Sequence, residues 1–230
     1  YISHTDSKSS FLDKIYQQVK KYMLRKKIKW IESEKKEKGK ILDFGAGTGD
    51  FLLEAKNNGW EVFGTEPNPD ARKLASEKKV DLEKDTSTFP SEGFDVITLW
   101  HVLEHVPDLE KQIEELKRLL KKDGLLIIAV PNFKSYDAFK YQEDWAAFDV
   151  PRHLFHFSRT AIRKIFGEHS FEVVQEKPLW FDAFYVSLLS EKYKKGKSNP
   201  LKAFLTGATS NQKARSTGEY SSLAYFLKKS

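Results

Sequence analysis

The chain has 230 residues, a net charge of +6 and no cysteine. This length fits one domain with a sizeable core, and the lack of cysteine excludes disulfides, cysteine-based zinc sites and cysteine nucleophiles. No signal-like segment and no apolar run long enough to cross a bilayer is found, so we expect a cytoplasmic protein.

Hydrophobic periodicity predicts helices and strands along the whole chain. Apolar residues recur at helical spacing near the start, so we assign residues 1–38 to an N-terminal helical cap segment, with its helix over 11–34. Short apolar runs predict strands at 41–44, 61–65, 80–82, 94–100, 125–130, 171–175 and 222–227. Amphipathic stretches between them predict helices at 50–58, from 68 onward, and at 107–122, 158–166, 180–193 and 201–214.

Strands that alternate with helices predict an α/β domain with helices on both faces of a mostly parallel sheet. This doubly wound, Rossmann-like domain would cover residues 39–230. An insertion at about 178–218 would precede its last strand.

The lysines do not gather on one surface, as they do in many nucleic-acid-binding proteins. Most fall on the polar sides of predicted helices, where solvated faces explain them. We therefore expect no specific nucleic-acid partner. For Lys20 to Lys29, an anionic membrane surface is a second interpretation, which would give a peripheral membrane contact. The sequence predicts no oligomeric state.

A glycine-rich turn, "ILDFGAGTGDF", follows the strand at 41–44. Glycines at 45, 47 and 49 allow positive φ and keep Cβ atoms away from a ligand. A phosphate-binding P-loop needs a lysine after the last glycine, and Asp50 stands there instead. Asp43 and Asp50 would repel a pyrophosphate but suit a ligand that carries an ammonium or a sulfonium.

The segment "LDFGAGTGDFL" resembles motif I of the class I S-adenosylmethionine-dependent methyltransferases. "VFGTEPNPDAR", "FDVITLWHVLEHVPD" and "LKRLLKKDGLLIIAVPN" resemble the segments that follow in this family. The resemblance covers roughly residues 41–132, and "DVPRHLFHFS" at 149–158 extends it.

The resemblance implies a seven-stranded sheet with an antiparallel last strand, and S-adenosyl-L-methionine as the cofactor. Asp43 would organise the ammonium of its methionine part, the glycines would pack beneath, and Glu66 would hold the ribose. The implied cofactor-binding residues are Asp43, Gly45, Ala46, Gly47, Gly49, Glu66, Pro67, Trp100 and His101. For the adenine, Asp85 is a loose match, and a solvated loop aspartate is an equally good interpretation.

Four of the six histidines follow strands whose carboxyl ends should border the ligand site. Methyl transfer to a hydroxyl requires a base, and histidine suits that role at neutral pH. The candidate catalytic residues are His153, His101 and His105, with His153 as the acceptor-side base. All four histidines have a structural alternative: His101 packs on the cofactor, His105 orients a helix, and His156 is a satisfied core histidine. For His153 the alternative is a structural role in its loop.

A metal site is a further alternative. If a helix follows the strand at 94–100, His101, Glu104 and His105 share one face and are able to ligate Zn²⁺ or Mg²⁺. Some quinone-type O-methyltransferases carry Glu-x-x-Glu-His here. Because His101 replaces the first glutamate, we favour a site without metal.

Aromatic residues are concentrated between positions 133 and 148. They would line an apolar acceptor pocket, or form a lid that packs its own small core. Both interpretations stay open at this stage.

These patterns favour a methyltransferase that acts on a small or lipid-linked acceptor, at oxygen. Methylation of nucleic acid or protein is the alternative within enzymes, but the Asn/Asp-Pro-Pro-aromatic motif is missing. An NAD-dependent oxidoreductase, or a catalytically silent nucleotide-binding scaffold, is the alternative from another class.

Overall fold

The computed structural model describes residues 11–197 and 199–230. Six strands form one sheet: β1 (Lys40–Phe44), β2 (Glu61–Thr65), β3 (Phe94–Trp100), β4 (Leu120–Pro131), β5 (Phe171–Pro178) and β6 (Ser222–Lys229). The α-helices are α1 (Phe11–Glu34), α2 (Asp50–Asn57), α3 (Pro69–Glu77), α4 (Leu109–Leu119), α5 (Tyr136–Tyr141), α6 (Arg159–Glu168), α7 (Asp182–Lys195) and α8 (Pro200–Thr217). Three single-turn 3₁₀ helices lie at η1 (Leu103–His105), η2 (Gln142–Asp144) and η3 (Ala146–Phe148).

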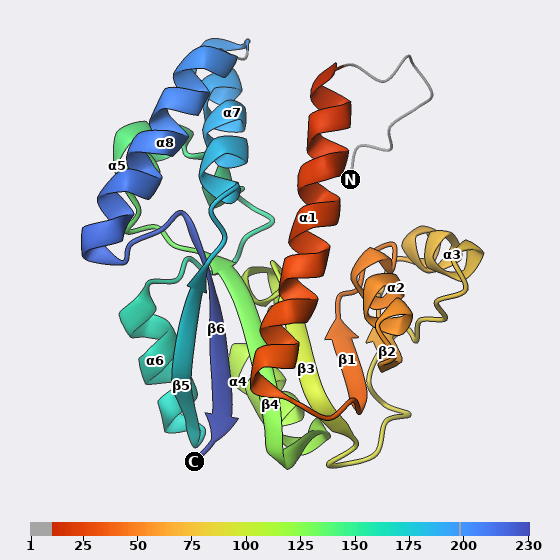
Figure 1. The fold of residues 1–230 in the computed structure, drawn as a ribbon. Helices are drawn as coiled ribbons and strands as arrows, with labels where there is room; N and C mark the ends of the chain where they lie inside the picture. The colour runs from red at the N-terminus through yellow and green to blue at the C-terminus, as the bar shows by residue number, and fades with distance from the viewer. Residues whose placement is uncertain (1–10, 198) are drawn as a thin grey trace.

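The sheet has the order β2-β1-β3-β4-β6-β5, and β6 runs antiparallel to both neighbours (Figure 1). The predicted doubly wound fold with an antiparallel last strand is therefore confirmed. The number of strands is wrong by one. The expected strand at 80–82 is reduced to a single bridge between Thr65 and Glu83, because the polar run that follows continues as a loop.

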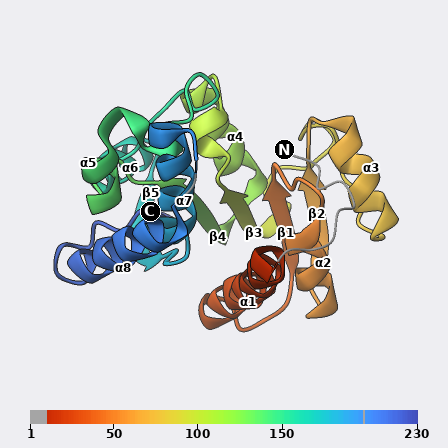
Figure 2. The same cartoon turned by 90° about the horizontal axis from the view of Figure 1, so that it is seen from above.

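Helices cover both faces of the sheet (Figure 2). Apolar residues of α1 and α2, including Ile28, Ile31 and Leu52, pack on one face. Residues of α4 and α6, including Leu116 and Ile162, pack on the other. Burial of both faces explains why the strands read as continuous apolar runs.

Local signals in the sequence set several helix ends. The side chain of Asn68 accepts hydrogen bonds from the N–H groups of Asp70 and Ala71, so it caps α3 as predicted. Gly59, with φ of 85°, follows the end of α2. The last turn expected for the helix at 107–122 belongs instead to β4, which begins at Leu120.

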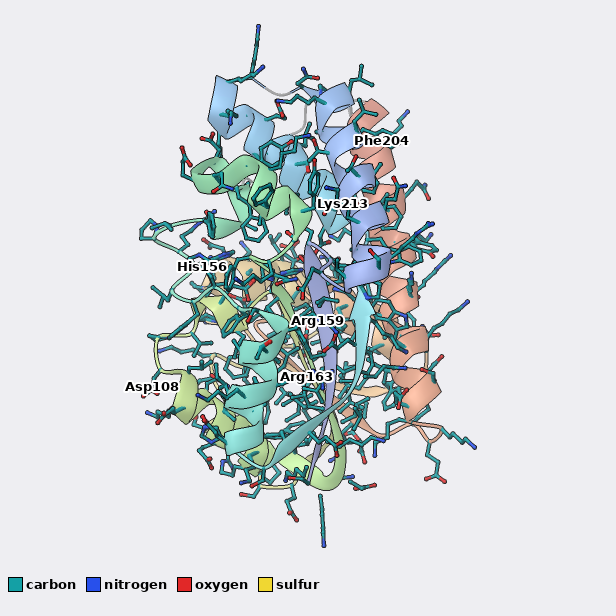
Figure 3. All side chains as sticks on the ribbon, turned by 90° about the vertical axis from the view of Figure 1, so that its left-hand side faces the viewer. Asp108, His156, Arg159, Arg163, Phe204 and Lys213 are labelled. Carbon is teal, nitrogen blue, oxygen red and sulfur yellow. The ribbon has the colours of Figure 1, made fainter. Side chains whose placement is uncertain are left out.

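Helices α5, α7 and α8 lie beyond the carboxyl ends of the parallel strands (Figure 1). Lower down, Arg159 and Arg163 fasten α6 to β5, since each donates a 2.7 Å hydrogen bond to Glu176 (Figure 3). Among the described residues, no helix is both long and apolar enough to cross a membrane. The domain boundaries given above stay a prediction.

Candidate functional site

The glycine-rich turn between β1 and α2 has the conformation that its sequence predicts. Positive φ angles of 69°, 56° and 74° occur at Gly45, Gly47 and Gly49. The N–H of Ala46 donates to the carbonyl of Thr65 over 2.9 Å, which fastens the turn to the end of β2. A Cβ at Gly45 would lie 2.7 Å from Val102, and one at Gly49 would lie 3.1 Å from Ala75, so these glycines also allow the turn to pack closely on its neighbours.

Asp43 lies at the end of β1 and is the acidic group of the turn. Its carboxyl is buried, and the hydroxyl of Thr98 donates to it over 2.6 Å. Burial raises the pKa of Asp43 to about 7, although the bond from Thr98 and the charge of Lys27 oppose the rise. A carboxylate that is costly to ionise in this way gains from a neighbouring cation.

Asp50 does not act as the second acidic group that the sequence suggested. Its carboxylate accepts hydrogen bonds from Lys20 over 2.6 Å and from Lys78 over 2.7 Å. Burial raises the pKa of Asp50, but these bonds outweigh it and hold the pKa below its usual value. Since two lysines compensate this charge, Asp50 would not repel a pyrophosphate as the sequence suggested. Of the two aspartates, only Asp43 still supports that argument.

Glu66 follows β2 and faces the turn. It accepts hydrogen bonds from the N–H of Gly47 over 2.9 Å and from the N–H of Asn68 over 3.0 Å. Arg72 donates to the carbonyls of Glu66 and Pro67 and so fixes the backbone here. Two strand ends therefore bring Asp43 and Glu66 to one glycine turn, as the motif predicts.

Lys27 of α1 reaches the site, and sequence reasoning missed it. Its Nζ lies 3.9 Å from the centre of the Trp100 ring. Burial lowers the pKa of Lys27 to about 8, although the charges of Asp43 and Asp182 oppose this change. One lysine among many on α1 carries no signal that separates it from its neighbours.

The acids at the turn also test the predicted cofactor. Asp43 offers a buried carboxyl, and Glu66 lies at the same turn through its bond to the N–H of Gly47. S-adenosylmethionine carries an ammonium and two ribose hydroxyls, so the residues of the site fit this cofactor.

The charges on α1 bear on the second interpretation of Lys20 to Lys29. Lys20 bonds Asp50, Lys27 faces Trp100, and Nζ of Lys26 lies 4.5 Å from the ring centre of Trp180. These three lysines are engaged within the molecule. The membrane contact stays a prediction.

His101 stands between two carboxylates. Its Nε2 is 3.0 Å from Asp182 and its Nδ1 is 3.4 Å from Glu104. Burial lowers the pKa of His101, but the hydrogen bonds to these acids outweigh it and raise the pKa to about 10. A protonated imidazole neither accepts a proton nor ligates a metal. The position of His101 between two acids therefore favours a charged, positioning role, and its role as a catalytic base stays a prediction.

His105 and His153 are brought together from distant segments, and their ring centres are 4.6 Å apart. Nδ1 of His105 donates to the carbonyl of Arg152, and Nδ1 of His153 donates to the carbonyl of Ala147. Burial is the main cause that lowers the pKa of His153 below its usual value, which favours the neutral form that a base requires. The role of His153 as the acceptor-side base stays a prediction.

Glu104 lies directly beside this pair of histidines. One ligating atom each from Glu104, His105 and His153 falls within 4.8 Å of the others. The expected face of His101, Glu104 and His105 does not form, because His101 has a φ of 57° and only a 3₁₀ turn follows. His153 takes the place of His101 in the cluster.

The exposure of His156 and of Asp85 decides between the interpretations given for these two residues. His156 is exposed, and its Nε2 donates to the carbonyl of Phe148, so it is not a core histidine. Figure 3 shows it at the surface. Asp85 is exposed and accepts two hydrogen bonds from Ser87, which favours the solvated loop over the adenine contact.

The aromatic segment forms a small core of its own. Tyr141 and Trp145 are fully buried and pack with Val186 of α7. Phe139, in contrast, is 72% exposed. The lid interpretation therefore describes the core of this segment better than a continuous aromatic pocket does.

Three known proteins show what the chain resembles. An uncharacterized methyltransferase of Bacillus velezensis is 33% identical over 107 residues, which are 43% of this chain and 50% of the relative. A ubiquinone biosynthesis O-methyltransferase of Actinobacillus pleuropneumoniae is 36% identical over 107 residues, which are 40% of this chain and 46% of the relative. The chain thus spans about half the length of these curated relatives.

Among solved structures, magnesium protoporphyrin IX methyltransferase of Synechocystis, with bound S-adenosylhomocysteine, has a TM-score of 0.64. The identity is 15%, and the match covers 99% of this chain and 91% of that one. This likeness shows the shared fold.

The family model for a methyltransferase domain matches residues 14–176. This match and the relatives confirm the resemblance stated for the glycine turn, and they support S-adenosylmethionine as the cofactor. The chain belongs to the family of methyltransferase domains.

Proposed function

We propose that this chain transfers a methyl group from S-adenosylmethionine to a hydroxyl of a small or lipid-linked acceptor. One observation carries the proposal: two carboxylates meet at the glycine turn, the buried Asp43 and Glu66, which accepts the N–H of Gly47 over 2.9 Å. Two acids at this turn favour a ligand with an ammonium and free hydroxyls over a pyrophosphate.

The chain's own residues would divide the binding of the cofactor. Asp43 would hold the ammonium of the methionine part and Glu66 the ribose hydroxyls. The backbone of the glycine turn would pack against the methionine part. When bound, S-adenosylmethionine supplies a methyl carbon that the sulfonium activates.

Support for an oxygen acceptor comes from the histidines beside the cofactor site, His153 and His101. Burial lowers the pKa of His153, and its Nδ1 donates to the carbonyl of Ala147. Its Nε2, which lies 3.9 Å from a carboxylate oxygen of Asp149, would take the proton of a hydroxyl. His101 is positively charged and held by Asp182, so it contributes charge and position. The relative named as a ubiquinone biosynthesis O-methyltransferase agrees with an oxygen acceptor.

The first experiment compares thermal shifts with S-adenosylhomocysteine, NAD and NADP. A ligand at one hundred times its Kd adds about 2.7 kcal/mol to the free energy of unfolding. Stabilisation by S-adenosylhomocysteine alone supports the proposal, and stabilisation by NAD alone contradicts it. Incubation of a host extract with labelled donor, followed by mass spectrometry of its aqueous and lipid fractions, then identifies the acceptor.

A further inference from the structure

The cluster of Glu104, His105 and His153 is built from two segments that are held together by the backbone. The carbonyl of Glu104 accepts the N–H of Leu154 over 2.8 Å and the N–H of Phe155 over 3.3 Å. These bonds place His153 beside the 3₁₀ turn η1. The three side chains therefore meet through the fold, since about fifty positions of sequence separate them.

Both histidines present one nitrogen to the cluster in the form that binds a cation. Because a carbonyl only accepts, Nδ1 carries the hydrogen in His105 and in His153. In a neutral ring the lone pair then lies on Nε2. Histidines that ligate metals usually donate their other N–H to a carbonyl or carboxylate in this way.

Glu104 brings a buried negative charge to the cluster. The residue is 1% exposed, and its Oε1 lies 3.4 Å from Nδ1 of His101. Its Oε2 has no hydrogen-bond partner among the described residues. Burying a polar atom without a partner is costly, so Oε2 remains available for a further positive charge.

We propose that Glu104, His105 and His153 bind one divalent transition-metal ion, of which Zn²⁺ is the best match. Two imidazoles and one carboxylate suit Zn²⁺ and related ions, whereas Mg²⁺ prefers oxygen ligands. Donors around a tetrahedral Zn²⁺ are about 3.4 Å apart. The present limit of 4.8 Å therefore requires only a small closure of the side chains.

This inference deepens the proposed function and rests on it for the role of the ion. Three protein ligands leave a fourth position open, and the hydroxyl of the acceptor would bind there. A bound ion would lower the pKa of that hydroxyl. Its proton would pass to solvent at the exposed His105, the oxygen would bond to the methyl carbon as the bond from sulfur to that carbon breaks, and the oxidation state of the metal would not change. With the ion bound, His153 would be a ligand, and the ion would take over the part that His153 has as the base in the metal-free site.

Metal binding is tested directly on the full chain after treatment with a chelator. Zn²⁺ is titrated by calorimetry, and Co²⁺ is followed by its visible absorption, which reports the coordination geometry. We expect one ion per chain. E104Q and H153Q should each weaken binding by about 100-fold or more, since each removes a ligand. H105Q, at an exposed position, provides the same test if E104Q fails to fold.

A matched control is available on the surface. Nδ1 of His169 lies 2.6 Å from a carboxylate oxygen of Glu114, so this pair offers a similar but incomplete set of donors. H169Q should leave the stoichiometry and the affinity unchanged. Lack of binding to the wild type, unchanged affinity in E104Q and H153Q, or loss of binding in H169Q would each overturn the inference.

The thermal shift with S-adenosylhomocysteine separates this inference from the proposed function. If the chain binds S-adenosylhomocysteine but no metal, the methyltransferase proposal stands and the metal site is rejected. If it binds metal at the three residues but not S-adenosylhomocysteine, the metal site stands and the proposed function fails. E104Q and H153Q should keep the shift, which also shows that they fold.

Discussion

The ammonium of Lys27 lies 3.9 Å from the centre of the Trp100 ring. Lys27 belongs to α1, whereas Trp100 ends β3 in the middle of the sheet. The contact brings a cation into the field of Asp43 and Asp182. Helix α1 therefore contributes charge to the cofactor site in addition to covering it.

The first prediction concerns the pH dependence of cofactor binding. The pKa of Asp43 is raised to about 7, so its carboxyl is increasingly neutral below that pH. Because the neutral form attracts an ammonium less, the affinity for S-adenosylhomocysteine should fall as the pH drops from about 8 to about 5, by at most about tenfold per unit. Calorimetry at several pH values measures this, and a flat profile would contradict it.

Replacing Lys27 should move that profile. The charge of Lys27 lowers the pKa of Asp43, so K27M is expected to shift the midpoint of the binding profile to higher pH. K29M is the control, since Lys29 is an exposed residue of the same helix. Equal shifts in both variants would show that the effect is a general one of net charge.

A third prediction concerns stability. Between the usual pKa of 3.8 and the raised value of about 7, the folded chain keeps a proton on Asp43 that the unfolded chain releases. The free energy of unfolding therefore falls by up to about 1.4 kcal/mol per pH unit in this range, and the loss is complete above it.

D43N removes this loss and keeps the oxygen that accepts from Thr98. Its melting temperature at about pH 8 should equal or exceed that of the wild type, while the shift with S-adenosylhomocysteine disappears. A less stable variant that still binds the ligand would contradict the assignment.

The residues expected to bind the cofactor, at the glycine turn and at Glu66, were largely predictable because the sequence patterns that indicate them are local. The glycines at 45, 47 and 49 need no distant contact to adopt positive φ, and the strand before them is a plain apolar run. The resemblance of the next segments then placed Glu66 at the neighbouring strand end. Here the local pattern and the final position agree.

The surroundings of His101 and His153 were less predictable because they depend on contacts between distant segments. His101 becomes a cation through Asp182, a residue of the insertion that carries no local signal. The change of partner from His101 to His153 depends on one backbone bend after β3, with φ of 57° at His101. For a residue other than glycine, such a bend is costly and has no pattern in the sequence.

A fourth prediction tests the ribose assignment of Glu66. E66Q removes the charge but keeps the shape of the side chain, so affinity for S-adenosylhomocysteine should fall by about 10- to 100-fold, the value of a charge-assisted hydrogen bond. E61Q, at the exposed opposite end of β2, should bind as the wild type does. Equal affinities of the two variants would reject the assignment.

The fifth prediction concerns the helices beyond the strand ends. Asp137 of α5 is fully buried and accepts hydrogen bonds from Trp145, Ser210 and Ser221 over 2.6–2.8 Å. These bonds join α5 to α8 and to the start of β6. D137A would leave three buried donors without a partner, each at a cost of about 1–3 kcal/mol.

We therefore expect D137A to lower the free energy of unfolding by about 3 kcal/mol or more, measured by urea denaturation. E143A, at an exposed position in η2 of the same segment, should change it by less than about 0.5 kcal/mol. D137N keeps one acceptor oxygen and should fall between the two. If D137A were as stable as E143A, the three hydrogen bonds would not hold this region together, and its position over the site would need another cause.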